Sequence, residues 1–131
     1  MGFLALIHRL NARRYRAGAE AGDPVDQYNL AIELERAGDD VAAESWYRKA
    51  AEAGDPDSRN NLALMLDRTG RKSEALKLLV AAADDDAEIA YNVAVLNEEL
   101  GDEIAALAWY RRASEMGDSD AARELRRRGL H

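Results

Sequence analysis

Residues 43–55 read Ala-Glu-Ser-Trp-Tyr-Arg-Lys-Ala-Ala-Glu-Ala-Gly-Asp, and pieces of this tract occur again along the chain. Its central segment, residues 46–50, returns as Trp-Tyr-Arg-Arg-Ala at residues 109–113. Gly-Asp-Pro stands at residues 22–24 and again at 54–56, which is an offset of 32. A further step of 31 reaches a third copy of the same pattern. Agreement at this many positions identifies a tandem repeat.

Each copy of the repeat predicts two helices. Aspartate caps the start of a helix and glycine favours its left-handed end, so the first helix of each copy should run between an Asp and a Gly. These boundaries are Asp23 to Gly38, Asp55 to Gly70 and Asp86 to Gly101. The second helix runs from about Asp40 to Ala53, Lys72 to Ala83 and Glu103 to Met116. Because only a few residues join them, the two helices must be antiparallel neighbours.

The repeats fill almost the whole chain and predict an all-α fold in a single domain, residues 1–131. We expect a half-repeat helix at 3–20, full repeats at 22–53, 54–85 and 86–116, and a C-terminal capping helix within 117–131. Arg126 stands where the full copies have Ala31, Ala63 and Ala94. A charged residue at that position indicates the end of the stack, because no further helix need pack there.

The repeat resembles a known family. Its large and small residues follow the tetratricopeptide pattern, and the tract 43–55 is similar to a Sel1-like repeat. The positions that match the tetratricopeptide pattern are Tyr28, Asn29, Leu30, Ala31, Leu34, Gly38, Ala43, Tyr47 and Ala50. The resemblance implies an α/α superhelix, a right-handed solenoid with a concave groove lined by the first helices, in which family members bind peptides or other proteins. Two features depart from the family: the period is 31–32 instead of about 34, and Asn97 replaces Leu34 and Leu66.

The first helices present one face for packing and an opposite face for a ligand. Leu30, Ala31 and Leu34 share the packing arc. The groove candidates on the other faces are Tyr28, Asn29, Ile32, Glu35, Asn60, Asn61, Leu64, Asp67, Tyr91, Asn92, Val95 and Glu98. Tyrosine supplies contact area, asparagine can pair with a peptide backbone, and the acidic positions favour a basic ligand. We therefore expect a non-catalytic adaptor or scaffold that holds a peptide or protein segment in this groove.

Several groove candidates have a structural alternative. The Asn side chains can bridge neighbouring helices of the stack instead of a ligand, and Tyr28 and Tyr91 can be packed instead of exposed. The pairs Trp46/Tyr47 and Trp109/Tyr110 are expected in the core and not in an aromatic binding cage.

The helix at 3–20 suggests an alternative function, which is self-assembly into a homo-oligomer. This helix has no preceding partner helix in its repeat, so a set of apolar residues can be exposed and can associate. The set is Phe3, Leu4, Leu6, Ile7 and Leu10. Otherwise the helix folds down as an N-terminal cap, or the chain is a segment of a longer array.

Charge and composition limit the classes of partner and the compartment that fit this chain. The net charge is −7, with +3 in residues 1–20 and +3 in 121–131, so the part between carries −13. An acidic body repels nucleic acid and anionic membranes, and we expect neither as a partner. The chain has no cysteine, which fits a reducing, cytoplasmic compartment. Its richness in Ala, Arg and Asp is compatible with a bacterial source.

Catalytic and metal chemistry find little support in the sequence. The two histidines, His8 and His131, suggest no pairing with a nucleophile or metal partner. Asp84, Asp85 and Asp86 lack the alternating ligand spacing of a calcium loop, so we expect a turn and a helix cap there. No phosphate loop or nucleophile motif occurs. We therefore expect no enzyme activity, no metal and no cofactor.

Overall fold

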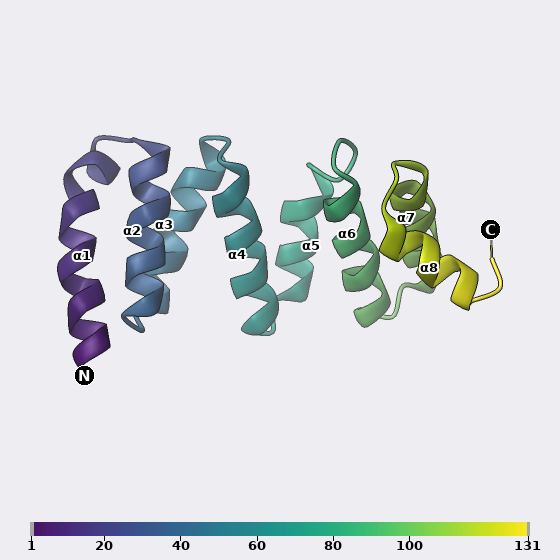
Figure 1. The fold of residues 1–131 in the computed structure, drawn as a ribbon, viewed down its shortest axis with the longest axis horizontal. Coiled ribbons are helices and arrows are strands. Elements are labelled where there is room, and N and C mark those ends of the chain that lie inside the picture. Colours follow the sequence, from purple (N-terminus) through teal and green to yellow (C-terminus); the bar gives the residue numbers. More distant parts are fainter. Residues whose placement is uncertain (1, 131) are drawn as a thin grey trace. The chain divides into compact units, whose positions relative to one another are not determined.

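The computed structural model describes residues 2–130, which leaves His131 outside the described part. Over this range the chain forms eight α-helices and no strand, and its main packing contacts join helices that are consecutive in sequence (Figure 1). The expectation of an all-helical fold is thus confirmed. The chain divides into two compact units at the junction of Met65 and Leu66, and each unit is described by itself.

The first unit contains α1 (Phe3–Glu20), α2 (Pro24–Arg36), α3 (Asp40–Glu52) and most of α4 (Pro56–Arg68). Its central helix, α2, packs on both α1 and α3. The predicted packing arc of α2 is buried, and α3 and α4 contribute further apolar residues to the core. The buried residues include Leu30, Ala31, Leu34, Ala43, Tyr47, Ala50, Leu62 and Ala63.

The second unit contains the end of α4, then α5 (Lys72–Val80), α6 (Ala87–Glu99), α7 (Glu103–Glu115) and α8 (Ser119–Arg127). Here α6 packs on α5 and α7, and α7 packs on α8. Buried residues include Leu79, Val93, Ala94, Ala106, Tyr110, Ala113 and Leu125. Asn97 is also buried, and its amide donates to the Val93 carbonyl at 2.9 Å, which satisfies one polar group at a position where the earlier copies have leucine.

Aspartate caps define the starts of most helices. Asp86 shows the geometry: its Oδ1 accepts from the backbone N–H groups of Glu88 at 3.0 Å and Ile89 at 3.1 Å. The expected helix cap in the 84–86 tract is therefore present. The helix ends use glycine, as at Gly38, which has a φ of 87° and lets Asp39 N–H bond back to the Leu34 carbonyl at 2.8 Å.

The second helix of the middle copy is shorter than expected. α5 ends at Val80 instead of Ala83, and the following residues form turns. In the other copies the chain leaves this helix through a left-handed glycine, such as Gly54 with a φ of 95°. The corresponding residue here is Asp85, and no described non-glycine residue has a positive φ. The chain therefore leaves the helix earlier and reaches Asp86 through a wider turn.

Candidate peptide-binding faces

The first helices of unit 1 carry a surface with little charge. Tyr28, Asn29 and Ile32 on α2 are half-buried, while Asn60 and Leu64 on α4 are exposed, Leu64 to 67%. Figure 1 shows α2 and α4 in front of α3, which supports both. These five residues are called the unit 1 face. They combine an aromatic ring, aliphatic side chains and amides.

A buried tyrosine hydroxyl supports the unit 1 face from behind. Tyr47 on α3 is fully buried, and its hydroxyl donates to Glu35 Oε1 at 2.8 Å. The Asn61 amide donates to the same hydroxyl at 3.4 Å, and the Tyr28 ring lies 6.2 Å from the Tyr47 ring. Burial, followed by the hydrogen bond with Glu35, raises the pKa of Tyr47 well above its ordinary value. Thus Glu35 and Asn61, two groove candidates, act as internal partners of Tyr47.

Unit 2 repeats the arrangement 63 residues later. Tyr91 lies 5.7 Å from Tyr110, ring centre to ring centre, and the Tyr110 hydroxyl is 3.5 Å from Glu98 Oε2. Burial and the nearby Glu98 and Glu124 carboxylates raise the pKa of Tyr110 to about 12. Tyr91 and Val95 are half-buried, and Asn92 is exposed. These last three residues are called the unit 2 face.

In unit 2, Arg128 contacts both Glu98 and the ring of Tyr110. Its guanidinium bonds Glu98, meets Glu124 Oε1 at 2.9 Å and Glu103 Oε2 at 3.1 Å, and lies 5.3 Å from the centre of the Tyr110 ring. Hydrogen bonds from Arg127 and Arg128 lower the pKa of Glu124 to about 2. Arg128 was not among the residues predicted from the sequence. One signal in the sequence pointed to the buried tyrosine and the glutamate that Arg128 contacts. It is the recurrence of Tyr28, Glu35 and Tyr47 as Tyr91, Glu98 and Tyr110.

All three acidic groove candidates have partners inside their own unit. Glu35 accepts from Tyr47, Glu98 is bonded by Arg128, and Asp67 is bonded by Lys72. Lys72 Nζ also lies 3.0 Å from Glu99 Oε2. Because Lys72 and Arg128 offset the charges of Asp67 and Glu98, these two positions offer less negative charge to a ligand than the sequence suggests, whereas Glu35 accepts from a neutral phenol and keeps its charge.

The aromatic pairs of the second helices divide between core and surface. Tyr47 and Tyr110 are buried, as expected, whereas Trp46 and Trp109 are only half-buried. A cation from the same helix covers each indole: Lys49 Nζ lies 4.3 Å from the Trp46 ring centre, and the Arg112 guanidinium lies 4.8 Å from that of Trp109. No cage forms from these pairs.

The apolar residues of α1 lie largely at the surface. Phe3 is 77% exposed, Leu4 70%, Leu6 48% and Leu10 49%, whereas Ile7 is half-buried. The same helix nevertheless packs on α2 through Ala12 and Ala19, and His8 Nδ1 lies 2.6 Å from Glu33 Oε2. α1 is therefore an integral helix of unit 1 with one apolar surface open.

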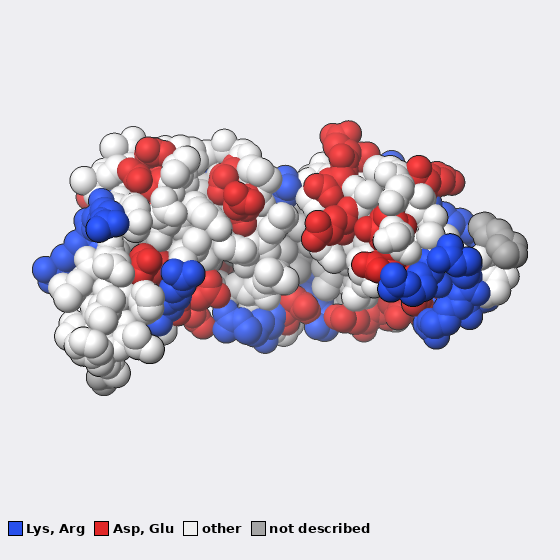
Figure 2. Space-filling view, viewed as in Figure 1, with Lys and Arg blue, Asp and Glu red and all other residues white. Residues whose placement is uncertain are grey.

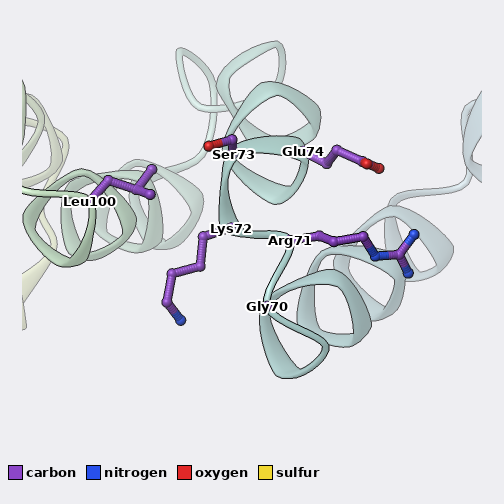
Figure 3. Close-up of a pocket in the computed structure, with 6 residues that line it drawn as sticks. All are labelled: Gly70, Arg71, Lys72, Ser73, Glu74 and Leu100. Atoms are coloured by element: carbon purple, nitrogen blue, oxygen red, sulfur yellow. The ribbon is translucent and has the colours of Figure 1, made fainter.

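A hollow in unit 2 does not bring reactive side chains together. About 260 Å³ in volume, it is lined by Gly70, Arg71, Lys72, Ser73, Glu74 and Leu100. Figure 3 shows the Arg71 and Glu74 side chains pointing away from Leu100, and Lys72 extending in a third direction. Within residues 2–130 no three His, Asp or Glu side chains are placed to hold a metal ion. No helix in that range is long and apolar enough to cross a bilayer.

A comparison with models of known protein families and with the curated proteins gave no match to this chain.

Proposed function

We propose that this chain is a tetratricopeptide- or Sel1-like solenoid that acts as a non-catalytic adaptor, and that the unit 1 face and the unit 2 face each bind an extended peptide segment. The observation that carries the proposal is the repetition of an aliphatic residue and an asparagine on all three first helices, with a tyrosine beside them on α2 and α6. Each such set has at least one accessible member. Each face thus offers an aliphatic and an amide contact to a peptide ligand.

The contacts of the buried tyrosines Tyr47 and Tyr110 favour binding, because they order the side chains of the faces before a ligand binds. In unit 1 the Tyr47 hydroxyl joins Glu35 of α2 and Asn61 of α4. A surface whose side chains are already ordered loses little conformational entropy on binding. Tyr28, held against Tyr47, would offer its outer edge to a ligand at low entropic cost.

The ligand that fits these faces is an extended segment with aliphatic or aromatic side chains. Leu64 and Ile32 provide apolar contact, and the exposed amide of Asn60 can both donate to and accept from a peptide backbone. Basic side chains on the ligand are not required, because Glu35, Asp67 and Glu98 already have internal partners.

Selection from a displayed random-peptide library tests the proposal. We expect the full chain to enrich apolar, extended peptides. Binding should weaken at least tenfold in a Tyr28→Ala, Leu64→Ala variant, as expected when a hot-spot aromatic is lost. Val41→Ala is the matched control, because Val41 is 86% exposed on α3, outside both faces. Peptides that bind the double variant as tightly as the unchanged chain would contradict the proposal.

A further inference from the structure

α1 presents a surface that differs in chemistry from the unit 1 and unit 2 faces. Phe3, Leu6 and Leu10 follow the spacing i, i+3 and i+7, so they share one face of the helix, and Leu4 lies beside them at its first turn. The buried Ala12 and Ala19 mark the side that packs on α2. Figure 2 shows this N-terminal part of the helix as an uncharged surface with basic residues above it.

The first turn of α1 extends beyond the helix that supports it. α1 has 18 residues and α2 has 13, and in Figure 1 the N-terminal end of α1 passes the end of α2. The contact of His8 with Glu33 places residue 8 beside the last turn of α2. Phe3 and Leu4 therefore lie at a protruding end, where a flat surface can reach them.

The charge on α1 is of one sign over most of its length. Arg9, Arg13, Arg14 and Arg16 are all exposed, and the first acidic residue of the chain is Glu20. Arg16 and Glu20 form a loose pair at 3.9 Å. The three other arginines thus flank the apolar residues with no carboxylate among them in the sequence.

We propose that the α1 face, defined as Phe3, Leu4, Leu6 and Leu10 with Arg9, Arg13 and Arg14, binds the surface of an anionic membrane. The apolar side chains would enter the boundary between headgroups and acyl chains, and the guanidinium groups would meet lipid phosphates. A phenylalanine and leucines beside arginines are the composition that interfacial helices use.

The sequence predicted no membrane partner because the chain as a whole is acidic. Screening makes local charge the deciding quantity, since exposed charges further apart than about 8 Å interact weakly at physiological ionic strength. Residues 1–20 carry +3, so the part of the chain that would touch the lipid is attracted to it.

A second copy of the chain fits the α1 face less well. An isologous pair would bring two sets of Arg9, Arg13 and Arg14 together without Asp or Glu on either face. A lipid surface with anionic headgroups provides apolar and acidic partners at once. The charge of the α1 face therefore favours the membrane.

Co-sedimentation with vesicles tests the assignment on the full chain. We expect binding to vesicles of phosphatidylcholine with phosphatidylglycerol, little binding to phosphatidylcholine alone, and release by salt. Arg13→Gln with Arg14→Gln should weaken binding about 25-fold, at about fivefold for each arginine. Leu6→Gln with Leu10→Gln should abolish it. Val41→Gln and Arg36→Gln, exposed on α3 and α2, are the matched controls and should bind normally.

Three outcomes would overturn the proposal: no binding to either vesicle, equal binding to both, or binding that both α1 double variants retain. Light scattering tests the competing occupant of the α1 face, which is a second copy of the chain. A dimer that Leu6→Gln with Leu10→Gln dissociates, in a chain that ignores vesicles, would assign the α1 face to a second copy. Because every substituted residue is exposed, the helical circular dichroism should match that of the unchanged chain.

Discussion

At the scale of single residues, the buried hydroxyl of Tyr47 connects two helices of unit 1 through hydrogen bonds. It links α2 and α4 through Glu35 and Asn61. Tyr110 occupies the same repeat position in unit 2, but its hydroxyl is 3.5 Å from Glu98, and Glu98 is also bonded by Arg128. The two tyrosines have equivalent positions in the repeat and unequal hydrogen bonds.

This difference predicts unequal losses on removing the hydroxyl. Tyr47→Phe leaves Glu35 and Asn61 without that partner and should lower the free energy of unfolding by about 1–2 kcal/mol. Tyr110→Phe should cost clearly less, because its hydrogen bond is at the distance limit. Urea unfolding of both variants measures the losses. An equal loss in the two variants would show that the Tyr47 hydrogen bonds contribute no more to the free energy of unfolding than the long contact of Tyr110.

The raised tyrosine pKa values predict a loss of stability at alkaline pH. Tyrosine in the unfolded chain ionises near 10, whereas Tyr110 in the fold ionises near about 12, and the pKa of Tyr47 is raised further. The fold thus favours the neutral phenols, so their contribution is complete below pH 10.0; the part from Tyr110 is lost as the pH rises through about 12, and the part from Tyr47 is lost at still higher pH. Unfolding curves against pH, followed with tyrosinate absorbance, should show this decline, and Tyr47→Phe should reduce its slope. A flat stability curve across this window would contradict the burial argument.

At the scale of helices, the contact of α1 with α2 depends on a small residue facing a larger one. A Cβ atom on Gly18 would lie 1.7 Å from Asp26 Oδ2, so Asp26 must move if alanine replaces the glycine. The next copy has Ala50 and Ser58 at the corresponding positions, and both are buried. In these two copies the larger residue on one helix is accompanied by a small residue on the other.

We expect a favourable coupling between these two positions. Gly18→Ala alone gains helix propensity but displaces the Asp26 carboxylate, so its net effect should be small or destabilising. Combined with Asp26→Ser, the same change should stabilise the protein relative to the sum of the single variants by about 1 kcal/mol. A double-mutant cycle by thermal unfolding measures the coupling. Strict additivity would mean that Asp26 relocates without cost.

The attachment of α8 depends on Arg128, which stands where the earlier copies bury Met65 and Leu96. Arg128→Met restores the repeat residue but leaves Glu98, Glu103 and Glu124 without the shared cation. We expect a loss of about 1–2 kcal/mol, since the guanidinium is mostly covered and bonds several carboxylates.

The neighbouring Arg127→Met is the control for this prediction. Its side chain is 68% exposed and pairs with Glu124 alone, so little should change. Hydrogen exchange of the α8 amides should accelerate in Arg128→Met and remain unchanged in Arg127→Met. Equal protection in both variants would show that apolar packing, and not the Arg128 contacts, holds α8.

At the scale of the whole molecule, the repeat pattern predicted the helices because each boundary has a local chemical cause. Asp86 caps α6 and Gly38 ends α2 as their positions in the repeat require. α5 ends early because position 85 is an aspartate where the other copies have glycine. The difference is present in the sequence, but its effect on the end of α5 was not predicted.

The candidate faces were less predictable, because side-chain partners depend on tertiary distances. The periodicity that places Glu35 and Asn61 on the outer surface contains no information about the reach of Tyr47. Arg128 is a similar case: an arginine near the chain end is typical of a solvated cap, and only the structure brings it to three carboxylates.

Mapping the binding site would show whether the first helices bind an extended peptide. A peptide selected by the full chain would be titrated into the isotope-labelled protein, and the backbone amide shifts followed by nuclear magnetic resonance. We expect the largest shifts in α2, α4 and α6, near Tyr28, Leu64 and Tyr91. Shifts confined to α3 and α7, or to the α1 face, would contradict the proposal.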